Sequence, residues 1–223
     1  MIENVLHLRV IENTDWATIL FVVSFAVIAI TKSAFENRFA DFAKLIYSDK
    51  YNNVYKDNSN LRSGFTISLF FIQIISLAFF IQLSLSFFGY ASKTDWILYI
   101  QIITFLFFFV LSKFLIEKII ATAFDIEEFV EQFNLQKVTF RTYIGLFILP
   151  INIILFYYDS ISRNILIVFI TIALIINVFT YLVSIKNYQN IIFGKLFYFI
   201  LYLCALEIAP YYFMYYCFTK GIA

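Results

Sequence analysis

The chain has 223 residues, of which 62% are hydrophobic, 22% aromatic and only 14% charged, and its formal net charge is +1 at pH 7. A soluble domain carries about a quarter charged residues, so this composition, together with long apolar runs, excludes a soluble globular protein and indicates a polytopic membrane protein. The nearly balanced charge, without a cluster of Lys or Arg, argues against nucleic acid as a partner.

Six apolar stretches predict an all-α, six-helix transmembrane bundle in a single integral membrane domain that covers residues 1–223. The first stretch is short for a span, which needs about 20 residues. We expect it to stay in the mature protein, because the segment before it is acidic and no small-residue cleavage pattern follows it. The predicted spans are approximately 16–30, 65–88, 96–114, 143–158, 165–185 and 196–218.

The distribution of positive charge predicts an orientation. The first, third and fifth loops hold twelve of the sixteen Lys and Arg residues, and only Arg9, Lys93, Arg163 and Lys220 lie elsewhere. Cytoplasmic loops carry the excess of positive charge in membrane proteins. We therefore expect the odd-numbered loops to be cytoplasmic and both termini to face the opposite side of the membrane.

The first long loop, residues 31–64, begins with a pattern typical of an amphipathic helix. Arg38 and other charged residues lie away from an apolar stripe in this pattern. The stripe consists of Phe35, Phe39, Phe42 and Ile46. The polar stretch from Ser48 to Asn60 is rich in Asn and Asp and predicts an irregular loop.

The second long loop, residues 115–141, also has the period of an amphipathic cytoplasmic helix. Its apolar stripe is formed by Ile119, Ala123, Ile126, Val130 and Phe133. Its acidic face is formed by Asp125, Glu127, Glu128 and Glu131. This face is either a solvated surface or a docking surface for a basic cytoplasmic protein.

The sequence contains an internal similarity that suggests a repeated hairpin. Thr-Asp-Trp occurs at residues 14–16 and 94–96, in each case at the outer start of a predicted helix, where Thr or Asp can cap the helix and Trp can anchor in the headgroup region. Related pairs follow at similar offsets: Lys32 and Glu36 with Lys113 and Glu117, Arg62 with Arg141, and Gln73 with Asn152. Duplication and convergence both explain this pattern, and Lys113 and Glu117 are most simply an ion pair at the inner boundary.

Four polar residues from four predicted spans are expected at one depth. Gln73, Asn152, Asn177 and Glu207 lie about 13–18 Å from the cytoplasmic ends of their helices, at a rise of about 1.5 Å per residue. This places them near the midplane of a core about 30 Å thick. Ser24 and Thr104 lie at a similar depth.

Glu207 is the strongest chemical signal, because a carboxylate at the centre of a membrane costs about 2.5–3.5 kcal/mol on insertion scales. Pro210 lacks the N–H that would bond the carbonyl of Leu206, and the Tyr211 hydroxyl lies one turn from Glu207. Two interpretations are open. The polar layer is either a hydrogen-bonded clamp with Glu207 protonated, or a polar cavity in which Glu207 titrates or receives a substrate.

Motifs for catalysis or cofactor binding are missing from the sequence. It contains no P-loop, no G-x-S-x-G and no H-E-x-x-H, and its single His lies before the first span. Cys204 and Cys217 are about 20 Å apart along one helix and cannot form a disulfide. We expect no catalytic residues, no cofactor and no metal site, and therefore no enzyme.

The segment Tyr198-Phe-Ile-Leu-Tyr-Leu-Cys-Ala-Leu-Glu-Ile-Ala-Pro210 resembles the signature of an uncharacterised family, domain of unknown function 4271, found in bacteroidete bacteria. Residues 15–21, 47–51 and 65–70 are similar to the same family. The resemblance implies a multi-pass protein of the bacterial inner membrane, with both termini periplasmic given the charge distribution, and it brings no known activity.

These observations favour a non-enzymatic subunit or scaffold of an envelope complex. Besides the lipid bilayer, its expected partner is a protein bound to the cytoplasmic loops 31–64 and 115–141. The alternative is a small secondary carrier, for a proton or a lipid-linked substrate, that uses Glu207 at the membrane midplane.

Overall fold

The computed structural model describes residues 14–45, 50–55, 63–123, 127–158, 167–172, 174–176, 178 and 212. Every regular element in these ranges is a helix. Four are long and apolar enough to cross a membrane: α1 (Asp15–Ala34), α4 (Gly64–Phe87), α5 (Trp96–Ala123) and α6 (Glu127–Tyr157). Two are short, α2 (Glu36–Ala43) and α3 (Lys50–Val54).

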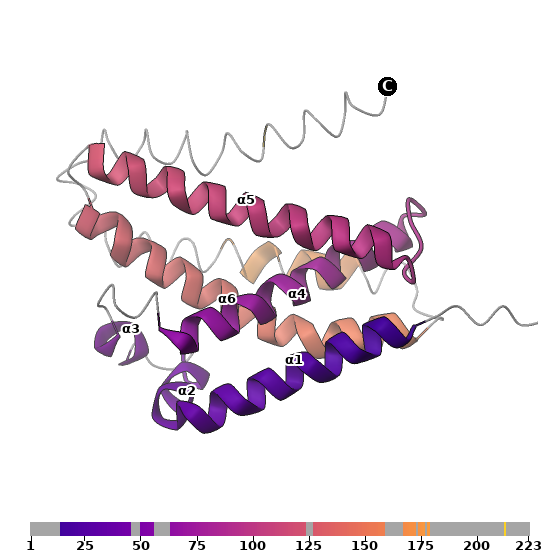
Figure 1. Ribbon diagram of the computed structural model, residues 1–223, viewed down its shortest axis with the longest axis horizontal. Helices are drawn as coiled ribbons and strands as arrows, with labels where there is room; N and C mark the ends of the chain where they lie inside the picture. Colours follow the sequence, from indigo (N-terminus) through magenta and orange to yellow (C-terminus); the bar gives the residue numbers. More distant parts are fainter. Residues whose placement is uncertain are drawn as a thin grey trace, which may run out of the picture.

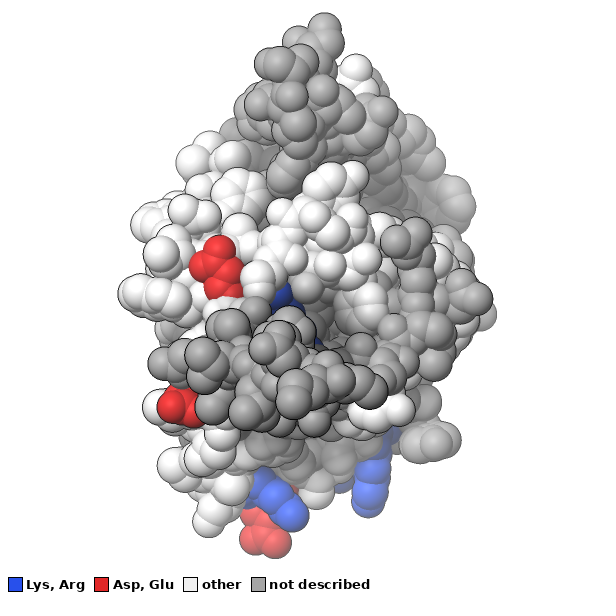
Figure 2. Space-filling view, turned by 90° about the vertical axis from the view of Figure 1, so that its right-hand side faces the viewer, with Lys and Arg blue, Asp and Glu red and all other residues white. Residues whose placement is uncertain are grey.

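The four long helices run alternately up and down. In Figure 1, α1 and α5 begin at the end of the molecule where α4 and α6 finish, whereas α2 and α3 lie at the opposite end. Helix α4 contacts α1, α5 and α6 and is the central element of the described bundle. Figure 2 views the end where α1 and α5 begin, and only a few charged side chains appear on its described surface.

The first four predicted spans are confirmed as long apolar helices, with corrected bounds. Helix α5 continues past residue 114 to Ala123, and α6 begins at Glu127, well before residue 143. At 1.5 Å per residue the two helices are about 42 and 46 Å long, more than a hydrocarbon core of about 30 Å requires. The predicted fifth and sixth spans lie outside the described residues, except for a short apolar helical stretch, Ile167–Ile176, and the helical position Tyr212.

The predicted amphipathic helix within loop 115–141 is wrong. Its apolar stripe is divided between two long helices, because Ile119 and Ala123 belong to the end of α5 and are exposed, whereas Val130 and Phe133 belong to α6 and are buried. Ile126 lies outside the described residues. Charged residues suggested that the third span ends and the fourth begins near them. These residues lie where α5 and α6 pack together, and both helices continue through them.

The first loop is largely as predicted, with two corrections. Phe42 is buried and Phe39 half-buried, and both rings contact Phe65 at the start of α4. Arg38, predicted on the polar side of α2, is buried. The stretch predicted as irregular contains α3, because Tyr51 packs its ring against Phe42 with ring centres 5.6 Å apart and so anchors a helical turn.

An aromatic cluster draws on all four long helices at the end where α1 begins. Trp16 stacks on Phe79 with ring centres 5.7 Å apart, and it also contacts Tyr99 and Phe156. Its indole N–H donates to the carbonyl of Thr94 at 3.3 Å. Trp16 is therefore partly a core residue, which corrects its prediction as a simple headgroup anchor.

The two Thr-Asp-Trp copies differ in structure. Trp96 is 56% exposed, as a headgroup anchor would be. The Asp95 carboxylate accepts hydrogen bonds from the N–H groups of Ile97 and Leu98, so the predicted cap is confirmed there. The Thr14 side chain does not cap α1. Duplication of the hairpin stays a prediction.

Helices α4 and α6 approach each other closely at Gly145. A Cβ atom on this residue would lie 3.0 Å from both Cα and Cγ of Gln73. The absence of a side chain at Gly145 therefore permits the backbones to pack together, as small residues do in membrane helix interfaces.

We predict that Gly145→Val destabilises the bundle by about 1–3 kcal/mol, because the added carbons must displace the α4 backbone. Gly64→Val is the matched control, since a Cβ there meets Phe35 at an ordinary 3.7 Å. Valine is slightly better than glycine in a helix, so propensity does not cause a loss at either site. Thermal unfolding in detergent measures both variants, and equal melting temperatures would contradict the prediction.

Candidate functional site

The structure places two members of the predicted polar layer in the α4–α6 interface. Thr142 donates its hydroxyl to Oε1 of Gln73 at 3.0 Å, and Asn152 donates its amide to the carbonyl of Ser76 at 2.7 Å. Gln73 is 5% exposed and Asn152 is fully buried. Each amide therefore bonds across the interface, but the two do not bond to each other.

The rest of the predicted site is not brought to this interface within the described residues. Asn177, Glu207, Pro210 and Tyr211 lie outside them. Ser24 is buried in α1 and donates to the carbonyl of Leu20, whereas Thr104 is exposed on α5. The described half of the layer thus has the arrangement of a clamp between two helices.

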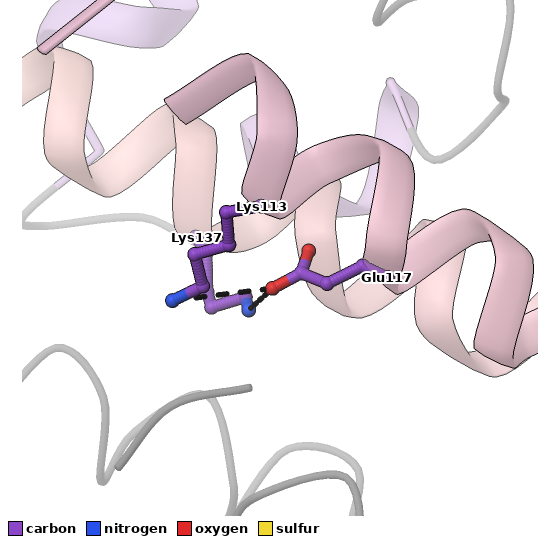
Figure 3. A network of polar contacts seen from close by, with 3 residues as sticks. All are labelled: Lys113, Glu117 and Lys137. Carbon is purple, nitrogen blue, oxygen red and sulfur yellow. Dashed lines mark hydrogen bonds and ion pairs between the residues drawn. The ribbon is translucent and has the colours of Figure 1, made fainter. Parts of the chain in front are cut away.

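A buried ionic cluster, Lys113–Glu117–Lys137, joins α5 to α6 (Figure 3). Lys137 Nζ donates to Glu117 Oε1 at 3.3 Å, and Lys113 Nζ lies 4.0 Å from the same oxygen. All three side chains are less than a tenth exposed. The Lys137 ammonium also lies 4.8 Å from the centre of the Phe133 ring, where the face of the ring attracts a cation.

The position of this cluster follows from helix geometry. Glu117 is about 31 Å along α5 from Trp96, close to the thickness of a hydrocarbon core of about 30 Å. Lys113 and Glu117 share one face because they are four residues apart. Charges removed from water at this depth require opposite charges or hydrogen bonds, and here α5 and α6 supply them to each other.

The sequence predicted the Lys113–Glu117 pair but missed Lys137, which makes the shorter contact with Glu117. The error followed from assigning residues 115–141 to a separate loop helix. With α6 starting at Glu127, Lys137 lies within the same antiparallel helix pair as Glu117.

A second polar site, the Arg38 pocket, was also missed. The Arg38 guanidinium donates to the hydroxyls of Ser63 at 2.8 Å, Thr66 at 3.1 Å and Tyr51 at 3.3 Å. It lies over the rings of Phe65 and Tyr55, at 4.7 and 4.9 Å from their centres. One side chain of α2 thereby holds both α3 and the first turn of α4.

The chemistry of the Arg38 pocket suits a fixed structural joint. Ser63 caps α4 by accepting from the N–H of Thr66, and the same hydroxyl receives Arg38. Burial raises the pKa of the Tyr51 hydroxyl above its usual value, while the charge of Arg38 and their hydrogen bond oppose that rise. Tyr51 is therefore neutral at physiological pH.

Both the ionic cluster and the Arg38 pocket place a charged side chain in contacts between helices. Within the described ranges, no group of three or more His, Cys, Asp or Glu side chains is placed to hold a metal ion. Both sites join helices at the end of the bundle that carries α2 and α3, where α5 ends and α6 begins.

The model of the family described as "Domain of unknown function (DUF4271)" matches residues 17–218. The chain belongs to this family. The family assignment predicted from the C-terminal segment is therefore confirmed, while the origin in bacteroidete bacteria stays a prediction. No curated protein and no solved structure matches the chain.

We predict that Glu117→Leu destabilises the protein by about 3–5 kcal/mol, because it leaves buried lysines without their shared carboxylate. Lys118→Leu, at the exposed neighbouring position, should change stability by no more than about 0.5 kcal/mol. Chemical unfolding in detergent measures both.

A double variant tests the coupling directly. Lys137→Met combined with Glu117→Leu should lose less stability than the sum of the two single losses. Each single substitution already removes the contact between the two side chains, so the second substitution cannot remove it again. Strictly additive losses would show that the cluster contributes no pairwise energy.

Proposed function

We propose that this membrane protein is a non-enzymatic subunit or scaffold of a bacterial envelope complex, and that its partner binds the cytoplasmic platform formed by α2 and α3. Membership of this family of unknown function and four apolar helices support the assignment as a membrane protein. The proposal assigns it to the inner membrane, with the platform in the cytoplasm.

The Arg38 pocket is the observation that carries the proposal. A connection between two spans needs no structure of its own, yet this one is folded into two helices and fixed to α4 by a buried guanidinium. Its outer surface is exposed at Glu36, Asn37, Ala40 and Lys44. A surface that is already ordered loses little conformational entropy on binding, which favours recognition of a partner.

The interior of the bundle supports a scaffold more than a carrier. A carrier needs polar groups that exchange their partners during transport, whereas Gln73 and Asn152 bond to the neighbouring helix in a closely packed interface. The ionic cluster likewise joins helices. The carrier hypothesis rests on Glu207, and none of the described contacts favours it.

Charge supports the proposed orientation. Lys32, Lys44, Lys50 and Lys118 are all exposed, and all lie on the side of the bundle that carries α2, α3 and the end of α5. Lys93 lies at the other end. Positive side chains collect on the cytoplasmic side of bacterial inner-membrane proteins.

The test places a photoreactive amino acid at Asn37, on the exposed surface of the platform, in cells that produce the full chain. We expect one protein to be cross-linked in near-equal amount. The matched control places the same group at Val22, which is 63% exposed on the apolar surface of α1 and should not label that protein.

Arg38→Gln tests whether cross-linking depends on the Arg38 pocket. It should abolish most cross-linking at position 37, because α2 and α3 lose their common anchor, while Lys44→Gln should retain it. Thermal unfolding shows whether the spans remain folded in both variants. Labelling of lipid alone, or of many proteins equally, would contradict the proposed function.

A further inference from the structure

Helix α5 is the most peripheral of the four long helices. Only 11% of its most apolar stretch is buried in the molecule, against 44% for α4 and for the corresponding part of α6. Its exposed surface contains a regular seam with the alternating spacing of three and four residues that coiled coils use. The seam is formed by Ile97, Gln101, Thr104, Phe108, Leu111 and Leu115, all of which are exposed.

The seam carries polar groups where lipid cannot bond to them. Gln101 and Thr104 lie about 7.5 and 12 Å along α5 from Trp96, and neither makes a hydrogen bond with the described residues. In α1, by contrast, Ser24 and Thr31 each donate to the carbonyl four residues earlier. An exposed amide within the hydrocarbon therefore calls for a partner helix that supplies hydrogen bonds at the same depth.

We propose that the seam is the contact with a second copy of this chain, in a parallel dimer with its two-fold axis along the membrane normal. Both copies insert in the same direction, so this symmetry places Gln101 opposite Gln101 and Thr104 opposite Thr104. An amide and a hydroxyl each donate and accept, so each group is complementary to itself.

The remaining residues of the seam suit this arrangement. Phe108, Leu111 and Leu115 continue the same spacing toward the inner end and supply apolar knobs for the opposite helix. No charged residue lies in the seam between Ile97 and Leu115, so the two-fold symmetry brings no like charges together within the hydrocarbon core.

Cysteine cross-linking in native membranes tests the geometry, after Cys204 and Cys217 have been changed to Ser. Phe108→Cys, in the seam, should form a disulfide-linked dimer under mild oxidation. Ile116→Cys is the matched control, because Ile116 is 46% exposed but lies about 100° around the helix from Leu115, outside the seam. A monomeric Phe108→Cys variant, or one that links to a different protein, would overturn the proposal.

The chemistry is tested separately by measuring dimerisation in liposomes by energy transfer between labelled copies. Gln101→Leu should weaken dimerisation about tenfold, the range expected for interhelical hydrogen bonds of this kind. Gln101→Asn should retain most of it, and Ile116→Leu, outside the seam, should have no effect. Unchanged dimerisation of Gln101→Leu would overturn the proposal. A disulfide within one chain, between Thr104→Cys and the native Cys204, would also overturn it, because the seam would then contact the same chain.

Discussion

The close contact of α4 with α6 determines where the other described helices can lie. Because Gly145 has no side chain, the α6 backbone reaches Gln73, and Gln73 and Asn152 bond across the interface instead of facing lipid. Helix α4 then has two sides left, which α1 and α5 occupy. Packing and hydrogen bonding thus act at one place, and an alternative register of the two helices would lose both.

The same rule operates at the end of the bundle that carries α2 and α3. Arg38, Glu117 and Lys137 are buried there, and each engages groups from a neighbouring helix. A simple hydropathy argument would end the transmembrane helices at such charged residues. In this structure the same residues join neighbouring helices. This explains why α5 and α6 continue beyond the membrane core and why a loop of the first hairpin is folded.

The sequence was sufficient to predict membrane class and the first four spans, because length and hydropathy determine them almost alone. The family was predicted from a segment that resembles its signature. The sequence was also sufficient to select Gln73 and Asn152 as interior polar residues. It could not identify Lys137 or Arg38 as buried, because their burial depends on which helices meet, and periodicity within one segment assigned Arg38 to the solvent side. Trp16 was misplaced for the same reason: an amphipathic ring at a helix start is compatible with both the headgroup region and a core until its neighbours are known.

The hydrogen bond from Trp16 to Thr94 has a consequence for biogenesis. Its ring packs against Phe79, Tyr99 and Phe156, which belong to three later helices. The first residues of the bundle to leave the ribosome therefore complete their contacts only when α6, the last of these helices, has entered the membrane. The indole N–H can bond to Thr94 before α6 is made, because Thr94 lies between α4 and α5, and until then the headgroup region can accommodate it. The amphipathic ring of Trp16 is thus stable in the headgroup region while the chain is being inserted. In the finished bundle it connects the first helix to the later ones.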